Sequence, residues 1–456
     1  MSKTYRSYEQ SQNYLLPPDI RDWLPDDHLA VYINNLVEEL DLSKIYGFYE
    51  SEGRGYPPYH PAMMVKVLLY AYCIGTISSR KINKSLYDDV AFRYLSANNF
   101  PDFRTICAFR KRHLDVLEDL FLQVLKLCEE AGLVKLGAVS LDGSKVKGNA
   151  SLSKSKKYGT LCKKEEELEK KVKELLEQAE RTDEEEDELY GDRRGDELPE
   201  GFRSKKEQLE RIKEAKRQLE EEQRKEQEEY QKKLKEREEK ENEGKKLRGR
   251  KPKEPDKKKN KNKKDKKRNT TDPDSRVMKT RNGFLQGYNA QVVVDADTQV
   301  IVATDLVQDE NDKHQQCMLY RVEQNLGRRP DKGLMDNGYW DEERLKKLEE
   351  SGIELYVATE GGKEGWKKLK EGKAPRGRIP KNATYKERME RKLLTKKGKK
   401  IYEKRRSSVE PVIGQIKNRI VKLLLRGLKK AKGEWNLIAT SHNILKLWRA
   451  ESSHTG

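Results

Sequence analysis

The stretch Ala138-Val139-Ser140-Leu141-Asp142-Gly143 begins as a short, partly β-branched apolar run and ends on a carboxylate followed by a glycine. A short apolar run that is bounded by a turn residue is typical of a buried β-strand. We therefore expect a strand over residues 138–142 that stops at Gly143 and carries Asp142 at its carboxyl end.

Further strand signals lie beyond a long polar stretch of the chain. Two strands are expected at Tyr288–Asp295 and Val300–Asp305, and the turn-forming residues between them predict an antiparallel hairpin. The other expected elements are a strand at Gly333–Asp336, a helix at Asp341–Ser351 and a strand at Glu354–Thr359. Together they predict an α/β fold built on a mixed sheet.

The first 135 residues are expected to form an all-helical N-terminal domain. Pro61 is placed to open an apolar helix, and apolar residues recur at helical spacing from Leu114 to Cys128. At the other end of the chain, residues 431–456 predict a C-terminal helix and tail, because Trp435, Trp448 and several aliphatic residues lie there.

A charged insertion separates the first expected strand from the strand hairpin. Residues 163–189 and 203–241 are rich in Glu, Lys, Arg and Gln, and each carries a narrow apolar stripe, so residues 157–244 predict an antiparallel helical hairpin. Residues 245–268 hold 15 basic and 3 acidic residues and almost nothing apolar, which predicts a disordered linker. This basic tract is either a solvated connection or an arm that contacts DNA phosphates.

Composition limits the class of protein. The 456 residues carry a net charge of +18, which favours a polyanionic partner such as nucleic acid. The longest purely apolar run, Val67–Ile74, has eight residues, whereas a spanning helix needs about 20, so we expect no contact with a membrane. The five cysteines are scattered and form no CxxC pair, which indicates a reducing cytoplasm.

Three carboxylates stand out by their positions. Asp142 and Asp336 each end an expected strand, and Glu410 lies in Arg406-Ser407-Ser408-Val409-Glu410-Pro411, where Ser408 and Pro411 predict the start of a helix. Such acids can converge where one end of a sheet meets a helix, and oxygen ligands of this kind suit hard divalent cations. Asp305, Asp309 and Asp312 compete with Asp336 as the second aspartate.

Local sequence around these acids resembles a known family. The segments Leu141-Asp142-Gly143-Ser144-Lys145, Asp336-Asn337-Gly338-Tyr339 and Arg406-x3-Glu410-x6-Lys417 are similar to the three signature segments of DDE transposases from bacterial insertion sequences. The insertion-sequence-four-like superfamily is most similar, and Tyr59-His60-Pro61 and Gly287–Gln291 extend the resemblance. It implies a ribonuclease-H-like catalytic domain over residues 136–156 and 269–430, interrupted by the helical hairpin.

The resemblance also implies a chemistry for the three acids. Asp142, Asp336 and Glu410 would hold two Mg²⁺ ions, with Mn²⁺ as a substitute, for in-line phosphoryl transfer on DNA. The implied DNA-contacting residues are Arg406, Lys417, Tyr402, Lys145 and Lys147. The family spacing Y-x2-R joins Tyr402 to Arg405, while the spacing to Glu410 selects Arg406, so the assignment of Tyr402 is the weaker one.

The expected function is therefore that of a DNA transposase. It would bind double-stranded DNA at the ends of its element, with the N-terminal domain contributing, cleave it and join the 3′-ends to a target. We expect a homodimer or larger assembly when ends are paired, in the cytoplasm at the nucleoid. Two alternatives are a metal-dependent nuclease on the same fold and a non-catalytic DNA-binding protein.

Overall fold

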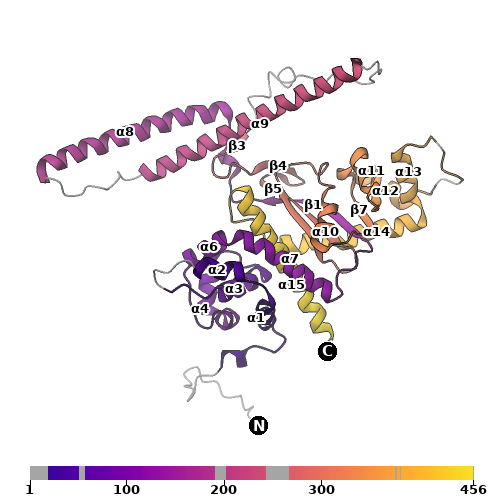
Figure 1. The fold of residues 1–456 in the computed structure, drawn as a ribbon, viewed down its shortest axis with the longest axis horizontal. Helices are drawn as coiled ribbons and strands as arrows, with labels where there is room; N and C mark the ends of the chain where they lie inside the picture. Colours follow the sequence, from indigo (N-terminus) through magenta and orange to yellow (C-terminus); the bar gives the residue numbers. More distant parts are fainter. Residues whose placement is uncertain are drawn as a thin grey trace, which may run out of the picture.

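The computed structural model describes residues 19–50, 57–190, 202–242, 267–374, 377–380 and 382–454. Its N-terminal part is helical, as predicted, and these helices pack around the apolar α3 (Figure 1). The elements are η1 (Ile20–Trp23), α1 (Leu29–Glu39), α2 (Ser43–Glu50), α3 (Pro61–Cys73), α4 (Ser79–Asp88), α5 (Val90–Ser96), α6 (Phe103–Arg112) and α7 (Leu114–Glu130).

A mixed sheet forms the centre of the second part. Its strands are β1 (Val139–Lys147), β4 (Arg276–Thr280), β5 (Gly283–Asp295), β6 (Ile301–Val307), β7 (Lys332–Met335) and β8 (Glu354–Val357). The order is β4-β5-β1-β7-β8, with β6 also paired to β5. β1 runs antiparallel to β5 and parallel to β7, and β7 runs parallel to β8. The predicted strand hairpin is β5–β6, which is confirmed, whereas β4 was not predicted.

The first strand is longer than its sequence indicated. We expected it to stop at Gly143, but β1 continues to Lys147 and pairs with β5 along its whole length. The glycine has a packing role instead: a Cβ at Gly143 would lie 2.4 Å from Gln291 Nε2 and 2.5 Å from Asp312 Oδ1. The absence of a side chain therefore lets two polar groups approach the backbone next to Asp142.

The helices of this second part flank the sheet (Figure 1). They are α10 (Met318–Leu326), η4 (Asn337–Tyr339), α11 (Glu342–Glu350), α12 (Gly362–Glu371), α13 (Tyr385–Leu394), α14 (Lys396–Arg419) and α15 (Leu428–His454). The predicted helix at 341–351 and strand at 354–359 correspond to α11 and β8, and both are confirmed.

Helix α14 corrects the prediction that a helix begins at Ser408. It starts after Thr395, whose side chain caps it, and it continues through Pro411. Proline has no N–H for the carbonyl four residues earlier, which here is that of Ser407. Gln299 Nε2 donates to this carbonyl at 2.9 Å, so a side chain from the turn between β5 and β6 replaces the missing backbone donor.

The C-terminal helix α15 packs against α7, α3 and β6, and so joins the helical part to the sheet. Asn443 exchanges two hydrogen bonds with the backbone of Ile301, both at 2.9 Å, and Trp435 donates to Thr304. One continuous apolar core runs from α1 through the sheet to α15. The predicted boundaries at residues 135 and 431 therefore lie inside a shared core.

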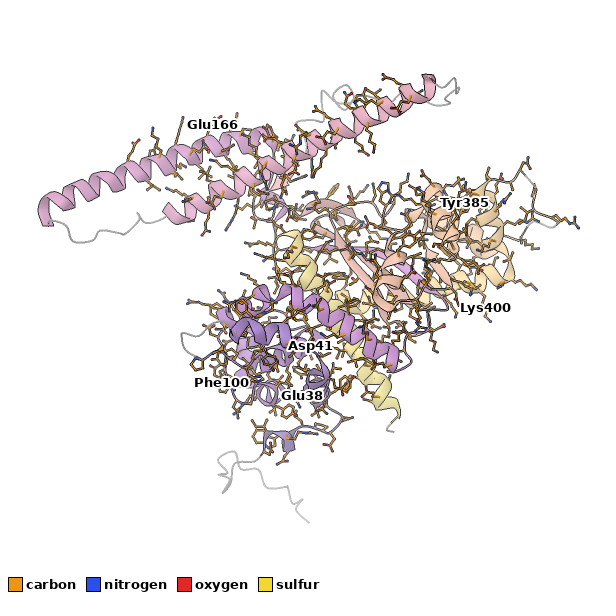
Figure 2. All side chains as sticks on the ribbon, viewed as in Figure 1. Glu38, Asp41, Phe100, Glu166, Tyr385 and Lys400 are labelled. Carbon is orange, nitrogen blue, oxygen red and sulfur yellow. The ribbon has the colours of Figure 1, made fainter. Side chains whose placement is uncertain are left out.

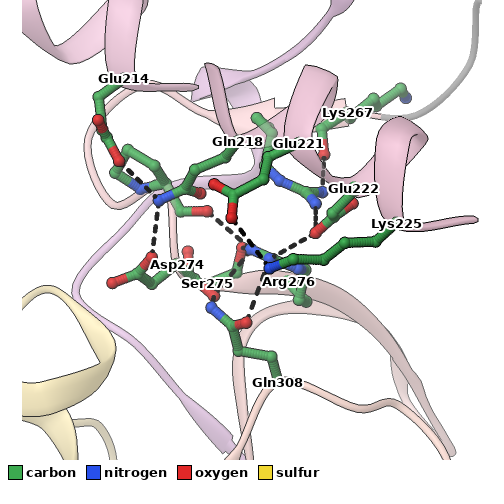
Figure 3. Close-up of polar contacts among 12 residues, drawn as sticks. Glu214, Gln218, Glu221, Glu222, Lys225, Lys267, Asp274, Ser275, Arg276 and Gln308 are labelled. Atoms are coloured by element: carbon green, nitrogen blue, oxygen red, sulfur yellow. Dashed lines mark hydrogen bonds and ion pairs between the residues drawn. The ribbon is translucent and has the colours of Figure 1, made fainter. Parts of the chain in front are cut away.

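The predicted helical hairpin is confirmed as α8 (Tyr158–Tyr190) and α9 (Phe202–Asn242), which project from the rest of the molecule (Figure 1). At its base, β2 (Ser155–Lys157) pairs with β3 (Lys267–Asn269). Side chains of α9 dock there: Gln218 donates to Asp274, and Glu222 pairs with Arg268 and Arg276 (Figure 3).

Most of the predicted basic linker, its residues 245–266, lies outside the described residues. Its last two residues, Lys267 and Arg268, belong to β3, so the prediction of a disordered linker up to residue 268 is wrong at that end. Arg268 is only 4% exposed because it packs against Glu222 of α9.

Candidate active site

The positions of Asp142 and Asp336 follow from the pairing of β1 with β7. Ser140 is the parallel partner of Leu334, so the residues two positions further along each strand, Asp142 and Asp336, lie at the same level. Successive side chains alternate between the two faces of a sheet, so Asp142 lies on the same face as Ser140, and Asp336 on the same face as Leu334. Asp142, inside β1, and Asp336, just past the end of β7, therefore lie side by side on adjacent parallel strands.

Helix α14 covers this side of the sheet. The hydroxyls of Ser140 and Ser408 lie 2.7 Å apart, and both serines are fully buried. This contact sets the position of the helix over β1. Arg405, almost one turn before Ser408, then meets Asp142, two residues after Ser140, at 3.1 Å from Nη1 to Oδ2.

Burial and mutual repulsion disfavour the charged forms of both aspartates. Burial raises the pKa of Asp142 to about 6; Arg405 opposes this rise, while Asp336 and Asp312 add to it. The pKa of Asp336 is also raised, chiefly by burial, and Arg405 and a hydrogen bond from the Gly338 N–H act in the opposite direction. The site therefore concentrates negative charge that a cation would relieve.

Glu410 reaches the site from the next turn of α14. Its Oε1 lies 3.8 Å from Arg405 Nη2, so Arg405 stands between Asp142 and Glu410. Arg406, which the sequence motif selected, contacts Glu410 at 3.4 Å but is half exposed. Arg405 is the residue that sequence reasoning missed, although its spacing to Tyr402 could have indicated it.

A fourth carboxylate, Asp312, lies beside the pair. Its Oδ1 accepts hydrogen bonds from Asn289 and Gln291, both at 2.7 Å, and is 3.6 Å from Lys145 Nζ. Gln291 in turn accepts from the hydroxyl of the buried Tyr339, which follows Asp336 in the same motif. This network ties the strand β5 to the segment that carries Asp336.

The carboxylates of the other two competing aspartates have different partners. Asp305 pairs with Arg321 and Lys432, and Asp309 accepts a hydrogen bond from Gln315. The structure therefore brings together Asp142, Asp336, Glu410 and Asp312.

The remaining predicted DNA contacts divide into two groups. Lys145 and Lys417 belong to the site: burial lowers the pKa of the Lys417 ammonium, Asp142 opposes this, and Lys145 adds to it. Tyr402 is buried, and its hydroxyl donates to the Met335 carbonyl, so it supports the end of β7 from inside. Lys147 is exposed at the end of β1, away from the acids.

The donor set suits a hard divalent cation, because carboxylates are the ligands that Mg²⁺ and Mn²⁺ prefer. In the part of the chain that the structure describes, however, no three His, Cys, Asp or Glu side chains are grouped closely enough to hold one ion. Arg405 instead supplies positive charge between Asp142 and Glu410.

Comparison with known proteins identifies the class of protein. Residues 18–112 match the family model described as Transposase domain (DUF772), and residues 262–444 match the Transposase DDE domain. No curated protein and no solved structure is detectably similar to the chain. The helical part and the mixed α/β sheet thus belong to an enzyme with a ribonuclease-H-like DDE domain. The chain is a DDE transposase of the insertion-sequence type.

This class of enzyme acts on DNA and generally uses divalent metal ions. Within the described ranges, no helix combines the length and the apolar character that crossing a bilayer requires.

Proposed function

We propose that the protein binds the ends of its mobile element, cleaves the DNA there and joins the 3′-ends to target DNA. The observation that supports this most strongly is the level placement of Asp142 and Asp336 on adjacent parallel strands, with Glu410 reaching them from α14. Burial raises the pKa values of both aspartates because it disfavours their charged forms, and a bound cation would relieve that cost.

In this proposal Asp142, Asp336 and Glu410 would hold two Mg²⁺ ions, which would supply charge stabilisation for phosphoryl transfer. Lys417 and Lys145 are placed to contact phosphates beside the reacting one, and Arg406 is exposed enough to do the same. Asp312 orients Gln291 and Lys145 behind the acids. The enzyme acts in the cytoplasm at the nucleoid, as a dimer or larger assembly when two ends are paired.

Substitution of the acids tests the proposal. Asp142→Ala, Asp336→Ala and Glu410→Ala should each abolish cleavage and joining and leave end binding within a few-fold of wild type, because affinity comes mainly from phosphate contacts. The measurement is a gel assay for nicked and joined products alongside a binding titration. Near-normal cleavage by any one variant would remove that acid from the site.

The same assay separates the alternatives. A nuclease on this fold would release ends without any joined product, and a non-catalytic DNA-binding protein would give neither. Asp312→Asn serves as a fourth variant: if it abolishes cleavage while Asp336→Ala does not, Asp312 is the second aspartate of the site.

A further inference from the structure

Two open, positively charged grooves follow one another from the end of β1 to the helical hairpin. The first, which we name the strand-end groove, has a volume of about 620 Å³, and its charged lining residues are Lys147, Lys154, Lys422 and Arg426. The second, the hairpin groove, has a volume of about 380 Å³ and is lined by Lys154, Lys164, Lys171, Arg211 and Glu167 among others. Lys154 and Thr271 line both, so the grooves are contiguous.

The charge of these grooves is largely uncompensated. The strand-end groove has four cations and no acid in its lining. Among the described residues, no ion pair involves Lys147, Lys154 or Lys422, and the same holds for Lys164 and Lys171 of α8. Arg211 is the exception, since it pairs with Glu207 of its own helix at 3.3 Å.

The strand-end groove lies further along β1 than the acids of the candidate active site. β1 carries Asp142 and Lys145 at the site and Lys147 at the edge of the strand-end groove, and at about 3.3 Å per residue Lys147 is roughly 17 Å beyond Asp142. On α8, which rises about 1.5 Å per residue, Lys164 and Lys171 extend the track by another 10 Å or so along the projecting hairpin (Figure 1). In Figure 2 the side chains of this hairpin, such as Glu166, point outward from the helices.

The geometry points to a DNA-binding track in which the strand-end groove and the helical hairpin hold double-stranded DNA that flanks the reacting phosphate. The inference rests on the proposed function, and it gives the insertion the role of lengthening the DNA-contacting surface. A continuous row of unpaired lysines matches the regular row of phosphates on a duplex, which presents one negative charge per about 1.7 Å of helix axis. Phe284, 62% exposed in the strand-end groove, adds an apolar contact for sugar or base.

The chain offers a matched control for the test. Lys163 and Lys170 have the same spacing on α8 as Lys164 and Lys171. Each lies one position earlier on the helix, so its side chain points in a different direction, and neither lines a groove. Lys164→Gln/Lys171→Gln and Lys163→Gln/Lys170→Gln therefore remove the same charge from the same helix. Lys147→Gln/Lys422→Gln tests the strand-end groove.

The experiment measures the affinity of each full-length variant for a random 40-base-pair duplex across a salt series. We expect Lys164→Gln/Lys171→Gln and Lys147→Gln/Lys422→Gln each to lower the log–log salt slope by about 1–2 and to weaken binding about tenfold at 0.1 M salt. Lys163→Gln/Lys170→Gln should keep the wild-type slope. Equal losses in the control and the groove variants would overturn the inference, and so would unchanged slopes in all three.

A second measurement separates this inference from the proposed function. At saturating protein, cleavage by the control Lys163→Gln/Lys170→Gln should match wild type, because these lysines line neither groove. Failure of the wild-type protein to cleave in any metal would contradict the proposed function. Normal cleavage by the wild-type protein, together with groove variants whose salt slopes match that of the control variant, would contradict the DNA-binding track but not the proposed function. Thermal melting of each variant verifies that the fold is intact.

Discussion

Arg405 is the residue on which the electrostatics of the site depend most. It is largely buried, it contacts Asp142 directly, and it lowers the pKa values of both Asp142 and Asp336. A buried guanidinium between carboxylates compensates their charge while no metal is present. Its neighbour Arg406 has the same chemistry but lies half in solvent, where an ion pair contributes little.

The loss of stability caused by replacing Arg405 should depend on pH, whereas the loss caused by replacing Arg406 should not. The pKa of Asp142, about 6 in the folded chain, exceeds the ordinary value of 3.8, so the folded state binds more protons between these pH values and stability falls as pH rises through them. Removing Arg405 raises that pKa further. Melting in EDTA from pH 4 to 8 should therefore show that Arg405→Ala destabilises more at pH 8 than at pH 5.

Arg406→Ala is the control for this experiment, and its effect on the melting temperature should be small at every pH. If both variants lost stability in the same pH-dependent way, Arg405 would have no special relation to the buried aspartates.

Sequence reasoning located the acids of the site but not all of their partners. Asp142 and Asp336 could be predicted because each follows a short apolar run, although β1 continues past Asp142 to Lys147. Arg405 and Arg406 are adjacent, and only the rotation of α14 over β1, set by the Ser140–Ser408 contact, decides which of them faces the sheet. The closeness of Asp312 to Gly143 depends on β5–β6 pairing and carries no local signal.

At the scale of elements, the helical hairpin is held to the sheet by a small polar base rather than by a large apolar core. Its own apolar cluster consists of Leu161, Ile212, Ala215 and Leu219. Below this cluster, Glu222 of α9 pairs with the buried Arg268 and with Arg276, and Gln218 reaches Asp274 (Figure 3). Asp274 also accepts from the N–H of Leu428, so the base of the hairpin is linked to the start of α15.

Glu222→Gln should weaken this base. It leaves the buried Arg268 without its acid, and because Glu222 itself is partly exposed we expect a loss of about 1–2 kcal/mol in the free energy of unfolding. Glu221→Gln removes an exposed pair with Lys225 on the same helix and should change stability far less. Denaturant unfolding of the two variants provides the comparison, and equal effects would show that the Arg268 pair does not hold the hairpin.

Elements with a strong repeating pattern could be predicted, and those that depend on distant partners could not. Both insertion helices and the β5–β6 hairpin follow from their own sequences. β4 and the small β2–β3 pair are short and polar, so their stability comes from neighbouring strands. The continuous α14 was missed because Pro411 normally marks a first turn, whereas here Gln299 provides the donor that proline lacks.

For the whole molecule, a buried polar cluster joins the helical part to the catalytic part. Glu434 of α15 is fully buried and accepts hydrogen bonds from the N–H groups of Leu424 and Leu425, both at 2.8 Å, and from the hydroxyl of Tyr72. Arg110 of α6 donates to the same hydroxyl and lowers the pKa of Glu434, which burial raises. Three elements distant in sequence, α3, α6 and α15, therefore share one buried polar cluster.

Glu434→Gln should destabilise the whole chain. The change removes the negative charge that favours the buried guanidinium of Arg110 and weakens the acceptor for the Leu424 and Leu425 N–H groups, so we expect a loss of about 1–3 kcal/mol in a single cooperative transition. Thermal unfolding monitored by circular dichroism measures it, with the exposed Glu130→Gln on α7 as the control. Two separate transitions in the wild type would contradict the idea of one shared core.

The position of α15 also has a consequence for biosynthesis. This helix fills the apolar face of α7, yet about 300 residues separate the two along the chain. At a translation rate of roughly 5–20 residues per second, the face of α7 waits on the order of 15–60 s for its partner. During that interval the nascent helical part exposes apolar surface, so its maturation is tied to completion of the chain, and chaperones that hold such surfaces gain a defined window in which to act.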